Sequence, residues 1–168
     1  MTGEHEHGRQ EYAAGPGRLL EDFKTGDQYA HWPGRTITEA DNIQFSLLTM
    51  NRHPTHCDHH YASQTEFGKP LVNSGLTLAI VLGMSVDDIS ANAVANLGWQ
   101  EIELLAPVHP GDTVYARSEV LSVRESKSRP GQGVVTVRTE GVRADGVVFM
   151  RFVRSCLVPS RASLAGAR

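Results

Sequence analysis

The sequence predicts an α+β fold in which a curved antiparallel sheet wraps around one central apolar helix. The segment 75–86 is apolar on nearly every face, which is typical of a buried helix. Beyond residue 92 the pattern changes to the alternation of strands, and Asp145-Gly146 is a strong two-residue hairpin signal. Helices that come first and are followed by a run of antiparallel strands indicate α+β architecture rather than alternating βαβ units.

Length and composition indicate one globular domain. The 168 residues are 40% hydrophobic and 21% charged, and a chain of this size buries about two-thirds of its unfolded surface. Residues 1–17 and 160–168 are expected to be flexible tails, which leaves a single domain over 18–159. The net charge of −3 gives no general attraction to nucleic acid. No apolar run has the length of a membrane-spanning helix, and two cysteines make no disulfide framework, so we expect a cytoplasmic protein.

The helices are expected before residue 92 and the long strands after it. In chain order they are an extended piece at 34–38, a helix over 39–48 capped by Thr38, a short helix from Asp58 to Thr65, and the central helix over 75–86 with a closing turn at 86–90. The strand segments are 94–105, 113–120, 133–141 and 147–158.

The segment 51–58 carries the strongest indication of function. Pro54 fixes its own φ and pushes His53 into an extended conformation, which stiffens the link between Asn51 and His56. Histidine titrates near neutral pH, so His56 is the candidate acid/base. A free backbone N–H at the start of the central helix, in Asn73-Ser74-Gly75, is suited to a developing oxyanion. Together they suit the addition of water to an α,β-unsaturated thioester.

These residues resemble the signature of the MaoC-like, R-specific enoyl-CoA hydratases. That family carries Asp-x-Asn-Pro-x-His-x-Asp and then Ile-Ala/Val-His-Gly, where this chain has Asn-Arg-His-Pro-Thr-His-Cys-Asp at 51–58 and Leu-Val-Asn-Ser at 71–74. The segments 107–113 and 126–133 resemble the family's loop into its second strand and its basic hairpin. The resemblance implies a hot-dog fold, His56 as catalytic acid/base and the Ser74 N–H as oxyanion donor. Coenzyme A would be part of the substrate, and the chemistry requires no other cofactor or metal.

Three departures from the family pattern concern the site itself. Asn51 stands where the family has an aspartate, His53 where it has asparagine, and Asn73-Ser74 where it has His-Gly. Asparagine cannot act as a base near neutral pH, but it can hold a water molecule or orient His56. The chain is similar to the mesaconyl-CoA and itaconyl-CoA hydratase branch, which also carries asparagine there. A carboxylate on the substrate would be repelled by an aspartate at position 51, and Arg52 or His53 could pair with it.

Other residues near these motifs have two interpretations each. Asn73 and Gly75 are expected substrate contacts at the start of the central helix. Lys127 and Arg129 lie in a flexible turn, where they either contact the phosphates of coenzyme A or are simply solvated. Asn51 could cap a turn and His56 could be a plain buried histidine. A zinc site is a further alternative. Its candidate ligands are so close together in sequence that their side chains cannot all point at one metal ion: His53, His56, Cys57, Asp58, His59 and His60.

Three functions remain open from the sequence. The favoured one is a hydro-lyase acting on a branched, dicarboxylic enoyl-CoA. The alternatives are a hot-dog thioesterase, which the loss of aspartate at position 51 disfavours, and a non-catalytic acyl-CoA-binding protein. The expected partner, besides the acyl-CoA, is a second copy of the chain in a homodimer or higher oligomer. One hot-dog unit leaves an exposed sheet edge and an incomplete pocket wall, and pairing covers both.

Overall fold

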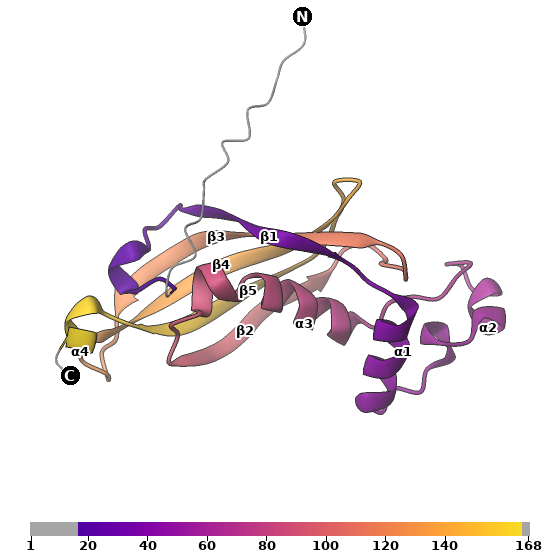
Figure 1. The fold of residues 1–168 in the computed structure, drawn as a ribbon, viewed down its shortest axis with the longest axis horizontal. Helices are drawn as coiled ribbons and strands as arrows, with labels where there is room; N and C mark the ends of the chain where they lie inside the picture. Colours follow the sequence, from indigo (N-terminus) through magenta and orange to yellow (C-terminus); the bar gives the residue numbers. More distant parts are fainter. Residues whose placement is uncertain (1–16, 166–168) are drawn as a thin grey trace, which may run out of the picture.

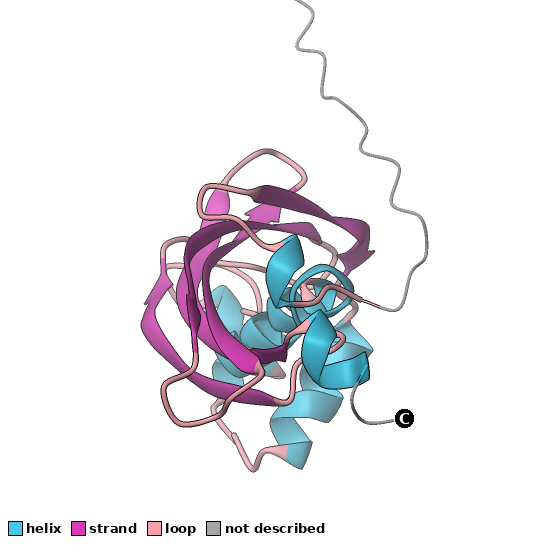
Figure 2. Cartoon of the chain, turned by 90° about the vertical axis from the view of Figure 1, so that its left-hand side faces the viewer, coloured by secondary structure: helices cyan, strands magenta, loops and turns pink. Residues whose placement is uncertain are grey.

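A five-stranded antiparallel sheet curves around one long helix in the computed structural model, which describes residues 17–165 (Figure 1). The strand order is β1-β3-β4-β5-β2, so β1 and β2 form the two edges. Figure 2, which looks along the molecule from one end, shows the strands as an arc with the helices inside it. The predicted α+β fold with a sheet-wrapped helix is confirmed.

The elements follow the predicted order along the chain. The helices are α1 (Glu39–Leu48), α2 (His59–Ser63), α3 (Ser74–Met84) and α4 (Arg161–Ala165), with 3₁₀ turns η1 (Leu20–Asp22) and η2 (Pro54–His56) and a π-helical turn η3 (Val86–Ser90). The strands are β1 (Gln28–Thr36), β2 (Ala95–Leu104), β3 (Thr113–Glu125), β4 (Gln132–Arg143) and β5 (Val148–Pro159). None of the helices described is both long and apolar enough to span a bilayer.

Side-chain caps explain why the first two helices begin where they do. The hydroxyl of Thr38 accepts from the backbone N–H of Asp41 at 3.1 Å, and the Asp41 carboxylate accepts from the Thr38 N–H at 2.9 Å. This capping box satisfies two otherwise free helical amides. Asp58 caps α2 through the N–H of Tyr61 at 2.9 Å, as its sequence position predicted.

Two segments differ from the sequence-based expectation. The extended piece predicted at 34–38 is the end of a nine-residue strand, β1. His31, Pro33 and Gly34 interrupt its apolar alternation, and its register with β3 shifts between His31 and Arg35. The expected tail 160–168 contains α4, because the N–H of Arg161 donates to the carboxylate of Glu21 at 3.0 Å. The tail predicted at the N-terminus lies, except for its last residue, outside the described residues.

The interior contains two apolar clusters separated by a polar layer. The first cluster packs α3 against β3 and β5 and contains Phe149 and Phe152, which are 1% and 0% exposed. Gly141 on β4 lies against it, and a Cβ there would be 2.5 Å from Cζ of Phe149. The second cluster lies under η3 and includes Ile89 and Val135. The apolar face of the sheet therefore packs against α3 through the first cluster and against η3 through the second.

The polar layer between the clusters links β1, β3, β4 and η3. His31 is 3% exposed. Its Nδ1 lies 2.8 Å from the Asp88 carboxylate and its Nε2 lies 2.7 Å from the Ser118 hydroxyl. The Ser118 hydroxyl is in turn 2.8 Å from that of Thr139. Burial would raise the pKa of Asp88, but hydrogen bonds from His31 and Arg18 outweigh it, so this pKa is lowered.

Asp88→Asn is expected to lower the free energy of unfolding near neutral pH by about 1–3 kcal/mol, the usual cost of losing hydrogen bonds to a charged group. Because the folded pKa of Asp88 lies below its unfolded value of about 3.9, its stabilisation is present above that value and is lost as the pH falls through the folded pKa. The stability gap between wild type and variant should therefore stay constant above about pH 5 and narrow as the pH falls below about 4. Urea unfolding followed by circular dichroism measures this gap, and a gap that widens in acid would contradict the assignment.

Candidate active site

A groove of about 410 Å³ lies where the start of α3 meets the end of β2 and the start of β5. Its polar side chains, within the described range, are those of His56, Ser74 and Thr77. Its other walls are apolar and are formed by Phe67, Leu71, Val72, Leu104, Leu105, Ala106, Pro107, Val108 and Phe149. Three polar side chains on an otherwise apolar groove are typical of a site that binds an apolar chain and fixes its reactive end.

His56 is held with one ring nitrogen toward the protein. The 3₁₀ turn that begins at Pro54 places His56 beside Leu71, and its Nδ1 lies 2.9 Å from the Leu71 carbonyl oxygen. A carbonyl oxygen only accepts hydrogen bonds, so Nδ1 must carry the proton. In the neutral imidazole Nε2 then keeps its lone pair, which leaves it able to take a proton.

Ser74 supplies an unused backbone donor at the start of α3. The amides around it are occupied: Asn73 N–H donates to Asn42 Oδ1 at 2.8 Å, and Gly75 N–H donates to Asn73 Oδ1 at 2.9 Å. The Ser74 N–H has no acceptor in the described part of the chain. The positive end of the α3 dipole adds to the attraction of this N–H for a negatively charged oxygen.

Asn42, which the sequence analysis did not single out, lies directly behind both groups. It is 0% exposed. Its Nδ2 donates to the carbonyls of His56 and Leu71 at 2.8 and 2.9 Å. A signal for it exists in the sequence, because Asn42 and Ser46 are spaced by four residues and so share the buried face of α1. Polar residues on a buried helix face need internal partners.

The Asn51 side chain caps a turn. Its Oδ1 accepts from the backbone N–H of His53 at 3.1 Å, which is an Asx-turn, and Asn51 does not line the groove. The structure thus gives this residue the turn-capping contact that was one of its two interpretations. Its role in holding a water molecule next to His56 stays a prediction.

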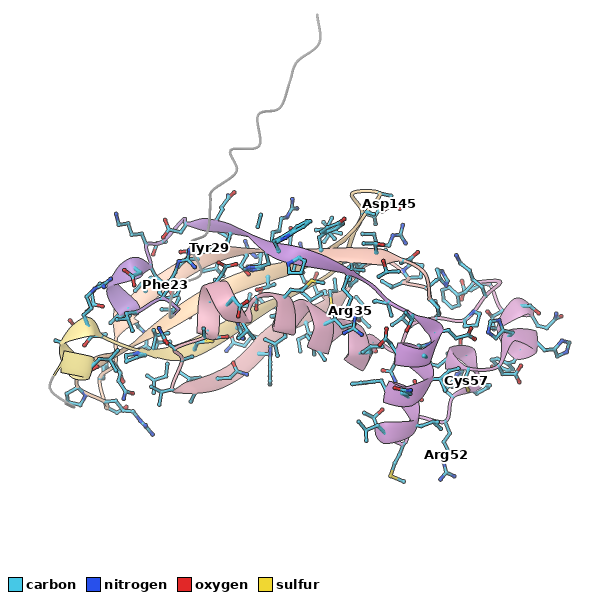
Figure 3. All side chains as sticks on the ribbon, in the orientation of Figure 1. Phe23, Tyr29, Arg35, Arg52, Cys57 and Asp145 are labelled. Carbon is cyan, nitrogen blue, oxygen red and sulfur yellow. The ribbon has the colours of Figure 1, made fainter. Side chains whose placement is uncertain are left out.

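Arg52 and His53 lie away from the groove. Figure 3 shows Arg52 extending away from the sheet, beyond the end of α1. The ring of His53 packs edge-on against Tyr61 and His56, with centroids 6.0 and 6.3 Å apart. Neither residue lines the groove, because the Asx-turn folds Asn51 back onto His53 and leaves Arg52 on the outside. The pairing of either residue with a substrate carboxylate stays a prediction.

Lys127 and Arg129 lie at the opposite end of the sheet. They belong to the turn that follows β3. Strand β3 starts opposite Thr36, next to α1, and is 13 residues long. At about 3.3 Å per residue this places the turn on the order of 40 Å from the groove. Lys127 and Arg129 therefore do not line the groove of their own chain, and their contact with coenzyme A stays a prediction.

Asn73 and Gly75 make contacts at the start of α3 rather than in the groove. Asn73 is 6% exposed, and both ends of its amide are used, by the Gly75 N–H and by the Ser46 hydroxyl. Neither Asn73 nor Gly75 lines the groove.

Among the described residues, no three His, Cys, Asp or Glu side chains come together as a metal site. Of the predicted site residues, the structure brings His56 and Ser74 together.

Comparisons with known proteins agree on one group of relatives. The sequence profile described as mesaconyl-CoA hydratase matches residues 9–167. The mesaconyl-CoA hydratase of Cereibacter sphaeroides is 36% identical over 90% of this chain and 44% of its own length. The β-methylmalyl-CoA dehydratase of Chloroflexus aurantiacus is 35% identical over 87% of this chain and 41% of its own length. The chain thus spans less than half the length of these two relatives.

A solved structure agrees in fold. A Mycobacterium tuberculosis protein with a double hot-dog fold superposes on this chain with a TM-score of 0.79, at 23% identity. The match covers 86% of this chain and 45% of that one. The sheet-wrapped α3 is therefore one hot-dog unit.

Proposed function

The chain belongs to the mesaconyl-CoA hydratase family, and on this premise we propose that it is a hydro-lyase that reversibly adds water to an α,β-unsaturated acyl-CoA. The observation that carries the proposal is the pairing on one groove of His56, with Nε2 free, and of Ser74, with an unused N–H. Hydration of an enoyl thioester needs both a proton-transfer group and a donor for the thioester oxygen.

The proposed mechanism uses these two groups in sequence. Nε2 of His56 takes a proton from water as the water oxygen bonds to the β-carbon of the substrate. The π electrons move toward the thioester, and the Ser74 N–H stabilises the negative charge on its oxygen. The enolate then collapses, and its α-carbon takes the proton from the His56 imidazolium. One histidine that handles both protons delivers hydroxyl and hydrogen to the same face of the double bond.

The acyl group that we propose is a branched C5 dicarboxylyl chain of the mesaconyl-CoA or itaconyl-CoA type. The names of the relatives support this choice. The groove, of about 410 Å³ and lined in part by the buried Phe149, is compatible with an acyl chain of this size. The lining residues that the structure describes include no lysine or arginine. A second carboxylate would therefore rely on the hydroxyl of Thr77 or on a neighbouring subunit.

The test is incubation of the full chain with mesaconyl-CoA, itaconyl-CoA and crotonyl-CoA, with enoyl absorbance and product masses recorded. We expect hydroxyacyl-CoA products and faster turnover of the C5 substrates. Turnover of crotonyl-CoA alone would remove the dicarboxylyl assignment and keep the hydratase. Release of free coenzyme A would favour the thioesterase, and binding without turnover would favour the non-catalytic alternative.

We also propose that a second copy of the chain completes the site. β2 is an edge strand with exposed apolar side chains, among them Leu97, Ile102 and Leu104, at 53%, 47% and 60%. Leu104 and Phe67, which line the groove, are 60% and 40% exposed. A solvent-exposed apolar wall is typical of a surface that a partner covers. The relatives, more than twice as long, have room for such a second unit within one chain.

Light scattering coupled to gel filtration is expected to give twice the 18.4 kDa mass of one chain. Ile102→Glu should shift the protein toward the single-chain mass, because it places a charge on the edge that pairing would bury. The matched control is Val147→Glu in the β4–β5 turn, where the side chain is 39% exposed and the residue takes no part in the pairing of β2 with β5. A wild type that elutes as a monomer would contradict the proposal.

A further inference from the structure

We propose that Asn42 is a positioning residue that holds the acid/base histidine and the oxyanion-binding amide in a fixed relation. This inference rests on the proposed hydratase activity and extends it to a residue that does not touch the groove. Asn42 is fully buried on α1. Its side-chain amide contacts three backbone groups: the carbonyl oxygens of His56 and Leu71 and the N–H of Asn73, the residue before Ser74.

The first link is to the imidazole of His56. The two N–H bonds of Asn42 go to the carbonyl of His56 itself, at 2.8 Å, and to the carbonyl of Leu71, at 2.9 Å. The Leu71 oxygen also accepts from Nδ1 of His56 at 2.9 Å. Both lone pairs of that oxygen are therefore used. Asn42 fixes the carbonyl that selects the Nδ1–H tautomer, and so it keeps Nε2 available as the base.

The second link is to the start of α3. The Oδ1 of Asn42 accepts from the N–H of Asn73 at 2.8 Å. Ser46, one turn further along α1, accepts from the Asn73 side chain at 3.2 Å. These two contacts hold the N-cap residue that immediately precedes Ser74. They leave the Ser74 N–H as the unused donor in the first turn of α3.

A purely structural role predicts a different outcome from a positioning role. A buried amide that only satisfies backbone groups would, when removed, destabilise the fold and leave the chemistry of each folded molecule unchanged. A positioning residue would also change the tautomer of His56 and the rate of the chemical step. A displacement of about 1 Å at a reacting group typically costs about 10²-fold in rate.

The decisive variant is Asn42→Asp, which has the same shape and keeps the acceptor for Asn73 N–H. It loses both donors and points a carboxylate oxygen at two carbonyl oxygens. Val135→Ala is the control, because it removes buried apolar atoms from the second cluster, remote from His56. Ser46→Ala is the milder companion variant, which keeps Asn42 and removes only the contact to the Asn73 side chain.

Two readouts are measured on the folded full-length protein: steady-state kcat and KM with the best enoyl-CoA substrate, and ¹⁵N signals of the His56 ring. For Asn42→Asp we expect kcat to fall about 10²-fold, a much smaller change in KM, and loss of the Nδ1–H tautomer signature. Val135→Ala should keep that signature and its kcat. Ser46→Ala should lower kcat in the same direction by less, and it carries the test if Asn42→Asp does not fold.

The proposal would be overturned by an Asn42→Asp variant that retains the wild-type kcat, or one in which the Nδ1–H signature persists despite a lower kcat. An equal loss of kcat in Val135→Ala would reduce Asn42 to a structural residue. If the wild type hydrates no enoyl-CoA, the proposed function fails, and the ring signals still decide whether Asn42 positions His56.

Discussion

His56→Ala is expected to lower kcat for enoyl-CoA hydration by a factor of about 10²–10⁴, the usual contribution of a positioned general acid–base group. The variant loses the proton acceptor for water and the proton donor for the α-carbon together. Its fold should persist, since the ring makes one hydrogen bond, to the Leu71 carbonyl. Steady-state kinetics with a mesaconyl or crotonyl thioester measure the loss, and circular dichroism verifies the fold.

His60→Ala is the matched control for this prediction. His60 is an exposed histidine on α2, four residues from His56 and outside the groove. Its replacement should leave kcat close to the wild-type value. If His56→Ala keeps more than about a tenth of the activity, another group moves the proton and the proposed mechanism is wrong.

Ser74→Pro is expected to lower kcat by about 10²–10³, the effect of removing one oxyanion donor. Proline at this position deletes the backbone N–H together with the side-chain hydroxyl. Ser74 is the first residue of α3, where proline is favoured because that amide has no intrahelical partner. The preceding residue, Asn73, has φ −56° and ψ 126°, a conformation that proline accepts after it.

Ser74→Ala separates the amide from the hydroxyl, because it keeps the N–H and removes the side-chain oxygen. The loss of kcat in Ser74→Pro should exceed that in Ser74→Ala by at least about tenfold. Affinity for a CoA thioester, measured by calorimetry, shows whether the proline ring blocks binding. Equal kinetics in the two variants would mean that the Ser74 amide does not stabilise the transition state.

Local signals predicted the first three helices of this fold and failed for α4 and for one strand. The boundaries of α1 were predicted at 39–48 and are observed there. The start was predictable because the capping box is formed by Thr38 and Asp41, which are three residues apart in the sequence. α3 is recognisable from the sequence because a helix that is apolar on nearly every face is stable only in the core. β1 was mostly missed, since His31 is a polar residue whose partners, Asp88 and Ser118, lie far away in sequence.

The site divides in the same way between local and long-range information. Pro54 and the start of α3 are local features, and the sequence therefore located His56 and Ser74 correctly on one groove. The coenzyme A contact of Lys127 was predicted from its charge, its place in a flexible turn and the resemblance to a basic hairpin, none of which shows that 13 residues of β3 separate this turn from the α1 end of the sheet. Asn42 was missed because a buried asparagine in a helix looks like an ordinary surface residue until its three partners are seen.

The groups proposed to carry out the reaction, with the residues that hold them, all come from a short stretch between Asn42 and Ser74, before the last four strands begin. Those strands add to the groove only apolar side chains, such as Leu104 on β2 and Phe149 on β5. The groups proposed to react thus lie in one part of the chain, whereas the strands contribute only apolar walls to the groove. Evolution can reshape the strand side chains to admit a new acyl group while the chemical step is inherited unchanged, which makes this architecture a ready source of new substrate ranges.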